Sequence, residues 1–86
     1  MTWRLERYHR VGPQGLVDEV DLGEDLDEED LRKAIGTTGP VRYAEWPVTG
    51  ALVDLVRSHL EDPAYLSRLR RLRYEHFLGY RSDENG

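Results

Sequence analysis

The first part of the chain alternates large apolar side chains with charged ones. Trp3 and Leu5 each have a charged or polar neighbour on both sides. A period of two is typical of a strand that buries one face, so residues 2–8 are predicted to form a strand.

A turn and a second strand are predicted to follow. The sequence VGPQG favours a turn, because glycine tolerates positive φ and proline fixes its own φ. Residues 16–22 return as a strand antiparallel to the first. Leu16, Val20 and Leu22 are expected on one face of it. Asp18 falls among them, which indicates a position near a sheet edge or at a β-bulge.

A short helix with clear end signals is predicted between Asp27 and Gly36. Asp27 can cap the first turn, and the three acidic residues after it are favoured there by the helix dipole. Gly36 is a typical end of a helix. Leu26 and Leu31 stand at the two positions of a hydrophobic staple.

Three further elements are predicted in the second half of the chain. Residues 41–48 fit a third strand, and Pro47 indicates that this strand ends there or lies at a sheet edge. Aliphatic residues between 49 and 60 form one apolar stripe, which predicts a second helix. The aromatic-rich segment 74–80 is predicted to be the last strand, and residues 82–86 to be a frayed tail.

The predicted order is strand, strand, helix, strand, helix, strand, in one α+β domain that spans residues 1–86. A chain of 86 residues buries only roughly 60 to 65% of its unfolded surface, so we expect one modest core and no elaborate enzyme. The absence of Cys excludes disulfides and thiolate metal sites. The charged N-terminus shows neither a signal peptide nor a membrane span, so a cytoplasmic protein is expected.

The negative charge of the chain is concentrated in one segment. Nine of the 17 Asp and Glu residues lie between Asp18 and Asp30, so this segment carries −9 and the other residues carry +4. The start of the predicted helix accounts for three or four of these nine. Like charges at such spacing repel one another, so we expect a cationic partner to offset the rest. The alternative is a solvated acidic face without a partner.

Neither a metal site nor an active site is predicted. The acidic segment does not fit a calcium-binding loop, which needs acids at alternate positions, a glycine at the sixth and a glutamate at the twelfth. The histidines, His9, His59 and His76, belong to no nucleophile motif and lack the spacing of metal ligands. We therefore expect no enzyme activity, no metal and no cofactor.

An arginine-rich segment provides an alternative function. SRLRRLR contains Arg68, Arg70, Arg71 and Arg73. Clustered arginines are the usual footprint of RNA binding, so a small RNA-binding or regulatory module is the second hypothesis. The same arginines could instead neutralise the acidic half of the chain. A protein with a pI of about 5.1 would also repel RNA with its acidic part.

Several motifs follow one another along the chain in the order found in a known protein family. They are the aromatic-ended first strand from Trp3 to Tyr8, the acidic second strand with Glu19, the short acidic helix closing on Gly36, the strand-to-helix passage from Trp46 to Leu60, and EHFLGYR at 75–81. Their order and spacing resemble the cloacin immunity family, small acidic bacterial proteins that bind and neutralise the ribosome-attacking RNase domain of a cloacin or similar colicin. The last segment resembles the closing E-Y-F-V-S-F motif of that family. SRLRRLR is more basic than the matching family segment, so the partner could be a different toxin.

The resemblance implies both a fold and a mode of binding. Family members fold as a curved four-stranded antiparallel sheet with short helices, and acidic residues on the open sheet face hold the toxin. The expected function is that of an immunity protein that neutralises a basic toxin domain, with a ribonuclease as the first expectation. The resemblance and the acidic segment together give the expected toxin-binding residues, which are Tyr8, His9, Leu16, Asp18, Glu19, Asp21, Glu45 and Trp46.

Two points stay open at the level of sequence. Trp46 fits a core residue as well as an interface anchor, and a structural adaptor without a toxin partner is a third possible function. The expected partner is a cognate toxin domain, with no direct binding to nucleic acid or membranes. The chain itself is expected to be a monomer or a weak homodimer.

Overall fold

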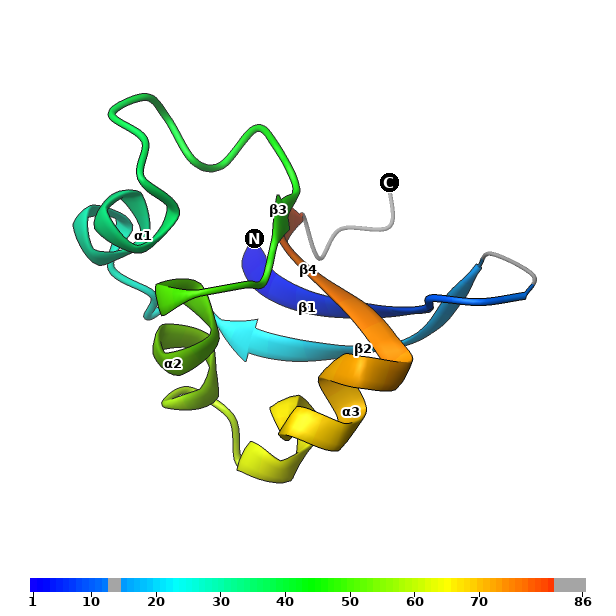
Figure 1. The fold of residues 1–86 in the computed structure, drawn as a ribbon. Helices are drawn as coiled ribbons and strands as arrows, with labels where there is room; N and C mark the ends of the chain where they lie inside the picture. Colours follow the sequence, from blue (N-terminus) through cyan, green and yellow to red (C-terminus); the bar gives the residue numbers. More distant parts are fainter. Residues whose placement is uncertain (13–14, 82–86) are drawn as a thin grey trace.

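The computed structural model describes residues 1–12 and 15–81, and its strands form one antiparallel sheet (Figure 1). The strands are β1 (Thr2–His9), β2 (Leu16–Gly23), β3 (Trp46–Pro47) and β4 (Tyr74–Arg81). They lie in the order β2-β1-β4-β3, and every neighbouring pair is antiparallel. The predicted α+β fold with a four-stranded antiparallel sheet is confirmed. The predicted tail 82–86, and Pro13 of the predicted turn, lie outside the described residues.

Three α-helices and one 3₁₀ helix complete the described part of the chain. They are α1 (Glu28–Ile35), α2 (Ala51–Arg57), the 3₁₀ helix η1 (Pro63–Leu66) and α3 (Arg68–Arg73). The sequence predicts only two helices, and α3 is the additional one. Ser67 caps α3 by accepting a hydrogen bond from the N–H of Arg70. The leucines of α3 are exposed, so the segment lacks the apolar stripe that identifies a core-facing helix.

The third strand is much shorter than predicted, and the prediction of a strand over 41–48 is wrong for most of that range. Only Trp46–Pro47 forms a strand, and the N–H of Val48 continues the contact by donating to the carbonyl of His76. Val41 is fully buried, and the indole Nε1 of Trp46 donates to the Val41 carbonyl at 2.8 Å. The chain therefore folds back on itself between these two residues instead of extending along β4.

The first helix follows its sequence signals closely. The carboxylate of Asp27 accepts hydrogen bonds from the N–H groups of Glu29 and Asp30 at 2.8 and 3.2 Å. Gly36 adopts a left-handed conformation with φ of 87° at the end of the helix. The predicted staple residues Leu26 and Leu31 are both buried. The prediction for this helix, including its capping residues, is confirmed.

The core lies on one face of the sheet, where the helices pack. β1 and β4 contribute Trp3, Leu5 and Leu78, and the helices contribute Leu31, Leu52, Val53, Val56 and Leu66. Residues directly opposite each other on paired strands share a face, and Leu5 lies opposite both Val20 and Leu78. None of the helices in the described ranges is long and apolar enough to cross a membrane.

A bulge in the hairpin changes the face of one predicted residue. Arg7 pairs with Asp18, but Tyr8 pairs with Leu16, so the register shifts between them. The alternation predicts Leu16 on the face of Val20. The shift places it instead on the face of Tyr8, so this prediction is wrong. Asp18 lies in an edge strand beside this bulge, as predicted.

Candidate functional site

The sheet face opposite the core carries a mixed set of charged and aromatic side chains, which we call the open face. It is defined by Arg4, Glu6, Tyr8, Leu16, Glu19, Asp21, Glu45, Phe77, Gly79 and Arg81. The pairing of β1 with its two neighbours places most of these residues on the same side. The open face holds four carboxylates and two guanidinium groups. At its margin, Glu75 pairs with Arg10 at 3.6 Å.

Glu6 lies at the centre of the open face and is only 2% exposed. Arg81 Nη2 lies 2.9 Å from Glu6 Oε2 and also binds the carboxylate of Glu45. A Cβ atom on Gly79 would lie 3.5 Å from Glu45 Cγ, so the missing side chain leaves the space in which Arg81 and Glu45 meet. Two carboxylates therefore share one guanidinium group.

This shared cation does not fully compensate Glu6. Burial raises the pKa of Glu6, and Glu45 raises it further, while Arg81 acts in the opposite direction without prevailing. Glu6 Oε1 is buried and has no hydrogen-bond partner. A buried acceptor in this state costs about 1–3 kcal/mol. The centre of the open face therefore holds more carboxylate than Arg81 compensates, and Glu45, with its side chain 45% exposed, is the carboxylate there that a further cation can reach.

Aromatic and apolar surface surrounds this acidic centre. The rings of Tyr8 and Phe77 meet edge to face with centroids 5.7 Å apart. Leu16 is 49% exposed at the neighbouring position of β2. Arg4 pairs with Glu19 at 2.8 Å on the other side of Glu6. Aromatic side chains beside ordered charges are typical of protein-binding surfaces.

The structure brings five of the eight expected site residues together and separates the other three. Tyr8, Leu16, Glu19, Asp21 and Glu45 lie on the open face. The other three, His9, Asp18 and Trp46, belong to the side on which the helices pack. His9 lies against the ring of Tyr74 at the end of β1, with ring centroids 5.4 Å apart.

Asp18 is committed to a polar network within the protein. Its carboxylate accepts hydrogen bonds from Arg7 Nε at 3.0 Å and Nη2 at 2.5 Å, and from the hydroxyl of Tyr65. The Arg7 guanidinium lies over the rings of Tyr65 and Tyr74, 4.3 and 4.7 Å from their centroids. Burial by itself would raise the pKa of Asp18, but the hydrogen bonds from Arg7 and Tyr65 lower it overall. This network ties the helical layer to the sheet.

Trp46 is placed on the core side. It lies opposite Leu78, which is fully buried, and packs as a partly buried residue against the core. Its indole N–H is used within the chain, in the bond to the Val41 carbonyl. These contacts favour a structural role for Trp46 over that of an interface anchor.

Sequence reasoning missed the two residues that complete the centre of the open face. Alternation along β1 places Glu6 on the other face of the strand from Trp3 and Leu5, and this indicates that Glu6 lies on the open face. No local pattern, however, indicates that Arg81, at the far end of the chain, pairs with it. Only the pairing of β1 with β4 brings the two side chains together.

The acidic segment receives much of its counter-charge from the chain itself. Five of its nine carboxylates form ion pairs, namely Asp18 with Arg7, Glu19 with Arg4, Glu24 with the N-terminus, Glu28 with Arg42 and Glu29 with Arg32. Asp21, Asp25, Asp27 and Asp30 have no ion pair among residues 1–12 and 15–81. A partner is therefore needed for less of this charge than the sequence suggests.

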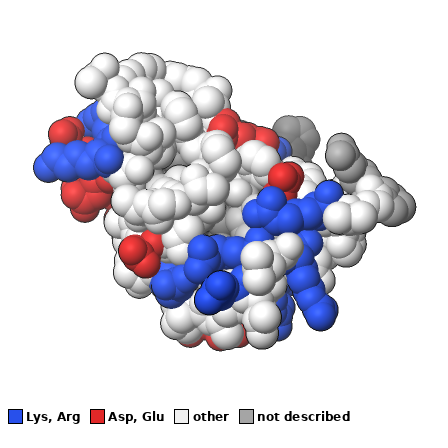
Figure 2. All heavy atoms as spheres, in the orientation of Figure 1, with Lys and Arg blue, Asp and Glu red and all other residues white. Residues whose placement is uncertain are grey.

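The basic residues gather on a different part of the molecule. Figure 2 shows one blue patch at the end of the molecule where α3 lies, well apart from the acidic and basic side chains around α1. Two arginines in or beside α3 are bound within the chain: Arg71 Nε donates to the Leu66 carbonyl, and Arg10 Nε donates to the Arg71 carbonyl. Leu69 and Leu72 are exposed between the arginines.

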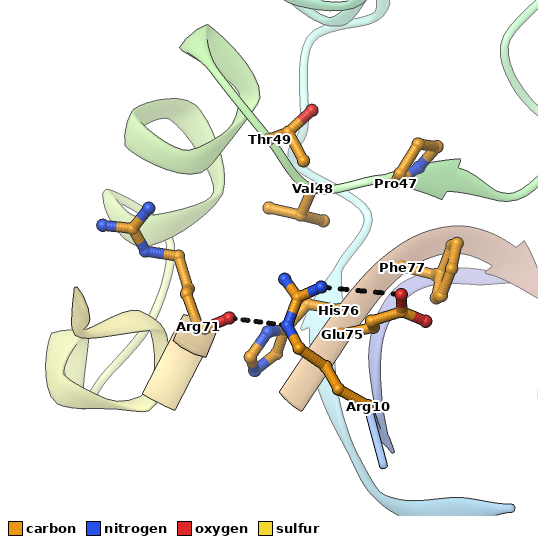
Figure 3. Close-up of a pocket in the computed structure, with 8 residues that line it drawn as sticks. All are labelled: Arg10, Pro47, Val48, Thr49, Arg71, Glu75, His76 and Phe77. Carbon is orange, nitrogen blue, oxygen red and sulfur yellow. Dashed lines mark hydrogen bonds and ion pairs between the residues drawn. The ribbon is translucent and has the colours of Figure 1, made fainter. Parts of the chain in front are cut away.

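A small pocket of ≈ 90 Å³ lies where β3 ends beside β4 (Figure 3). The ion pair of Arg10 and Glu75 crosses it, and Pro47 and Phe77 form part of its wall. His76 is 4% exposed here, and burial, followed by the charges of Arg7 and Arg10, lowers the pKa of its imidazole to about 4. The pocket is smaller than the roughly 300–1,000 Å³ of typical ligand sites.

Neither a metal cluster nor a related protein identifies the site. Within the described ranges, no group of three or more His, Asp or Glu side chains is placed to hold a metal ion. Comparison with family models, curated proteins and solved structures finds no match to the chain. The resemblance to the cloacin immunity family thus stays a prediction.

Proposed function

We propose that the chain is an immunity protein that binds and neutralises a basic toxin domain, with a ribonuclease as the first candidate, through its open face. The observation that carries this proposal is the centre of that face. Glu6 and Glu45 share the single guanidinium of Arg81, and a buried carboxylate oxygen of Glu6 has no partner. Glu45 is the accessible carboxylate of this pair, with its side chain 45% exposed, so a cation from a partner would bind there and reduce the repulsion between the two carboxylates.

The chemistry of ribonucleases makes them suitable partners. A domain that grips RNA presents Lys and Arg side chains at positions that match phosphate groups. Exposed carboxylates of the open face, such as Glu19 and Glu45, can occupy the same positions. Tyr8 and Phe77 supply apolar contact next to them, and aromatic anchors of this kind carry much of the binding energy in protein interfaces. Such inhibition needs no catalytic group in the chain.

The proposal is tested by rescue of bacterial growth during co-expression with cloacin-type ribonuclease domains. The variant Glu19→Lys/Glu45→Lys reverses two open-face charges, and like charges across an interface cost several kcal/mol. We expect the wild type to restore growth and this variant to fail. The matched control Glu29→Lys/Asp30→Lys makes the same charge change on α1, away from the open face, so it is expected to slow association at most and still to restore growth.

Urea unfolding of both variants establishes that each is folded before rescue is compared. Equal rescue by a folded open-face variant and by the wild type would contradict the proposed binding face. If the wild type restores growth with none of the basic nuclease domains tested, the proposal that the partner is a toxin is contradicted.

A second function is favoured by α3. Arg68, Arg70 and Arg73 have no ion pair among the residues that the structure describes, so their guanidinium groups are available for phosphate. An RNA-binding module would shift ribosomal RNA in a gel, and Arg70→Gln/Arg73→Gln would abolish the shift. The immunity proposal expects no shift from the wild type.

A further inference from the structure

The outer edge of β2 is not covered by another strand of the described chain. β2 has eight residues and pairs only with β1. In a strand, successive N–H and C=O groups point to alternate sides, so half of the backbone groups of β2 face outward. Such an edge is a template for pairing with another extended chain.

A groove of ≈ 470 Å³ runs beside this edge, on the side of the sheet where the helices pack. It lies between β2 and the segment that links α2 to η1. Val20, Leu22, Leu60 and Tyr65 give it apolar surface, and its volume suits several side chains of a bound segment.

The charges around the edge select a basic occupant. Asp21 borders both the open face and the groove, and with Glu61 and Asp62 it gives the groove three carboxylates; the lining has no Lys or Arg. Neither Glu61 nor Asp62 has an ion pair within the described ranges, and on the open-face side β2 also presents Glu19, which pairs with Arg4. A second copy of β2 at this edge would bring like charges together, which disfavours self-pairing. A basic segment would instead be attracted on both sides of the strand.

We propose that the β2 edge and its groove form a docking site for an extended, basic segment of a partner protein, which adds to the sheet as a further strand next to β2. Side chains of an extended segment alternate between two faces. Apolar side chains therefore enter the groove, and Lys or Arg side chains face Glu19 and Asp21. The occupant is a segment that alternates basic and apolar residues, bound by strand addition.

This site is distinct from the centre of the open face, and it does not depend on a toxin as partner. The two sites share Glu19 on β2, but the docking site rests on the uncovered edge and the groove, whereas the proposed toxin site rests on Glu6, Glu45 and Arg81. The two proposals can therefore fail separately.

The test is an NMR titration of the whole chain with the end-blocked peptide Lys-Val-Lys-Val-Lys-Val-Lys. We expect shifts of amide signals in β2 and at residues 59–62, together with slower amide hydrogen exchange in β2. The composition-matched peptide Lys-Lys-Val-Val-Val-Lys-Lys is expected to bind at least about threefold more weakly, because it lacks the alternation. Alternate backbone N–H groups of the first peptide can be N-methylated in two ways, on one set or on the other. In strand addition only one set points towards β2, so methylation of that set is expected to abolish binding and methylation of the other set is not.

A matched pair of variants separates the groove from general attraction between charges. Asp21→Asn/Glu61→Gln is expected to weaken peptide binding by about three- to tenfold, because it removes one carboxylate that faces the Lys side chains and one that attracts them from the groove. Asp62 is retained because it caps η1. The control Glu29→Gln/Asp30→Asn makes the same charge change on α1 and is expected to bind as the wild type does. Tyr8→Ala, on the open face, is also expected to retain peptide binding.

Three results would overturn this proposal. The first is an absence of β2 shifts at millimolar peptide. The second is equal binding of the unmethylated peptide and of both N-methylated peptides. The third is equal weakening by the groove variant and by the α1 control. Loss of toxin rescue with intact peptide binding would contradict only the function proposed for the open face.

Discussion

Burial acts on three ionisable side chains of the sheet with different results. It raises the pKa of Glu6 and lowers the pKa of His76, and so favours the neutral form of each. Asp18 also loses hydration, but hydrogen bonds from Arg7 and Tyr65 keep its carboxylate ionised. The partners of a buried group, and not burial alone, thus decide whether it carries charge.

His76 makes the stability of the protein depend on pH. The pKa of its imidazole is about 4 in the folded chain and near 6.5 in an unfolded one. The stabilisation that depends on the neutral ring is therefore present above pH 6.5 and is lost as the pH falls towards 4. By linkage the wild type loses up to about 3 kcal/mol of unfolding free energy over this range.

The measurement combines urea unfolding between pH 4 and 7 with NMR titration of the imidazole. His76→Gln is expected to lack this component, so the difference between wild type and variant should change with pH only below 6.5. A His76 signal that titrates near 6.5 in the folded protein would contradict the argument.

Among the elements, α2 begins in an unusual way. Its N-cap is Gly50, with φ of 59° and ψ of −133°, and no side chain caps the helix. Residues other than glycine rarely adopt this conformation. The turn before α2 directs the helix onto the core, where Leu52, Val53 and Val56 are buried. A glycine at position 50 is therefore required by the connection between β3 and α2.

We expect Gly50→Ala to lower the unfolding free energy by about 1–3 kcal/mol, because the added Cβ is strained at this φ. Gly39→Ala is the matched control. Gly39 has no positive φ, and the nearest atom to an added Cβ there is 4.0 Å away. The control is expected to change stability by less than about 0.5 kcal/mol. Urea unfolding at neutral pH measures both, and equal effects would contradict the proposed role of the turn.

On the scale of the whole molecule, charge is separated between regions. The chain has a net charge of −5, yet a basic patch covers the end of the molecule where α3 lies (Figure 2). Internal ion pairs neutralise more than half of the acidic segment, but Asp25 and Asp30 have no such pair within the described ranges. Unpaired surface charges of this kind act over long distances on an approaching partner.

If the partner is a basic toxin domain, association should be steered by this field. Asp25→Asn/Asp30→Asn is expected to lower the association rate about two- to fivefold at low salt and to leave the dissociation rate nearly unchanged. Tyr8→Ala should instead speed dissociation, because it removes an apolar contact. Stopped-flow measurements at two salt concentrations separate these effects, and the difference for the acidic variant should vanish at high salt. An association rate that is lowered as much at high salt as at low salt would contradict electrostatic steering.

Local interactions explain which parts of the structure could be predicted. The alternation of β1, the cap at Asp27 and the end at Gly36 involve residues within a few positions of one another, so they are visible in the sequence. The predicted strand over 41–48 is wrong because a tertiary contact, between Trp46 and Val41, folds the segment back. The helix α3 was missed because its leucines face outward and leave no apolar stripe.

The sequence by itself determined the class of the fold, the ends of α1 and the concentration of carboxylates between residues 18 and 30. Only the tertiary structure decided where those charges act. It paired Asp18 with Arg7 on the side of the sheet where the helices pack. It also turned Leu16 to the open face through a bulge and brought Arg81 between Glu6 and Glu45. The physical reason is that periodicity and capping are local, whereas the partner of a charge depends on strand pairing between distant segments.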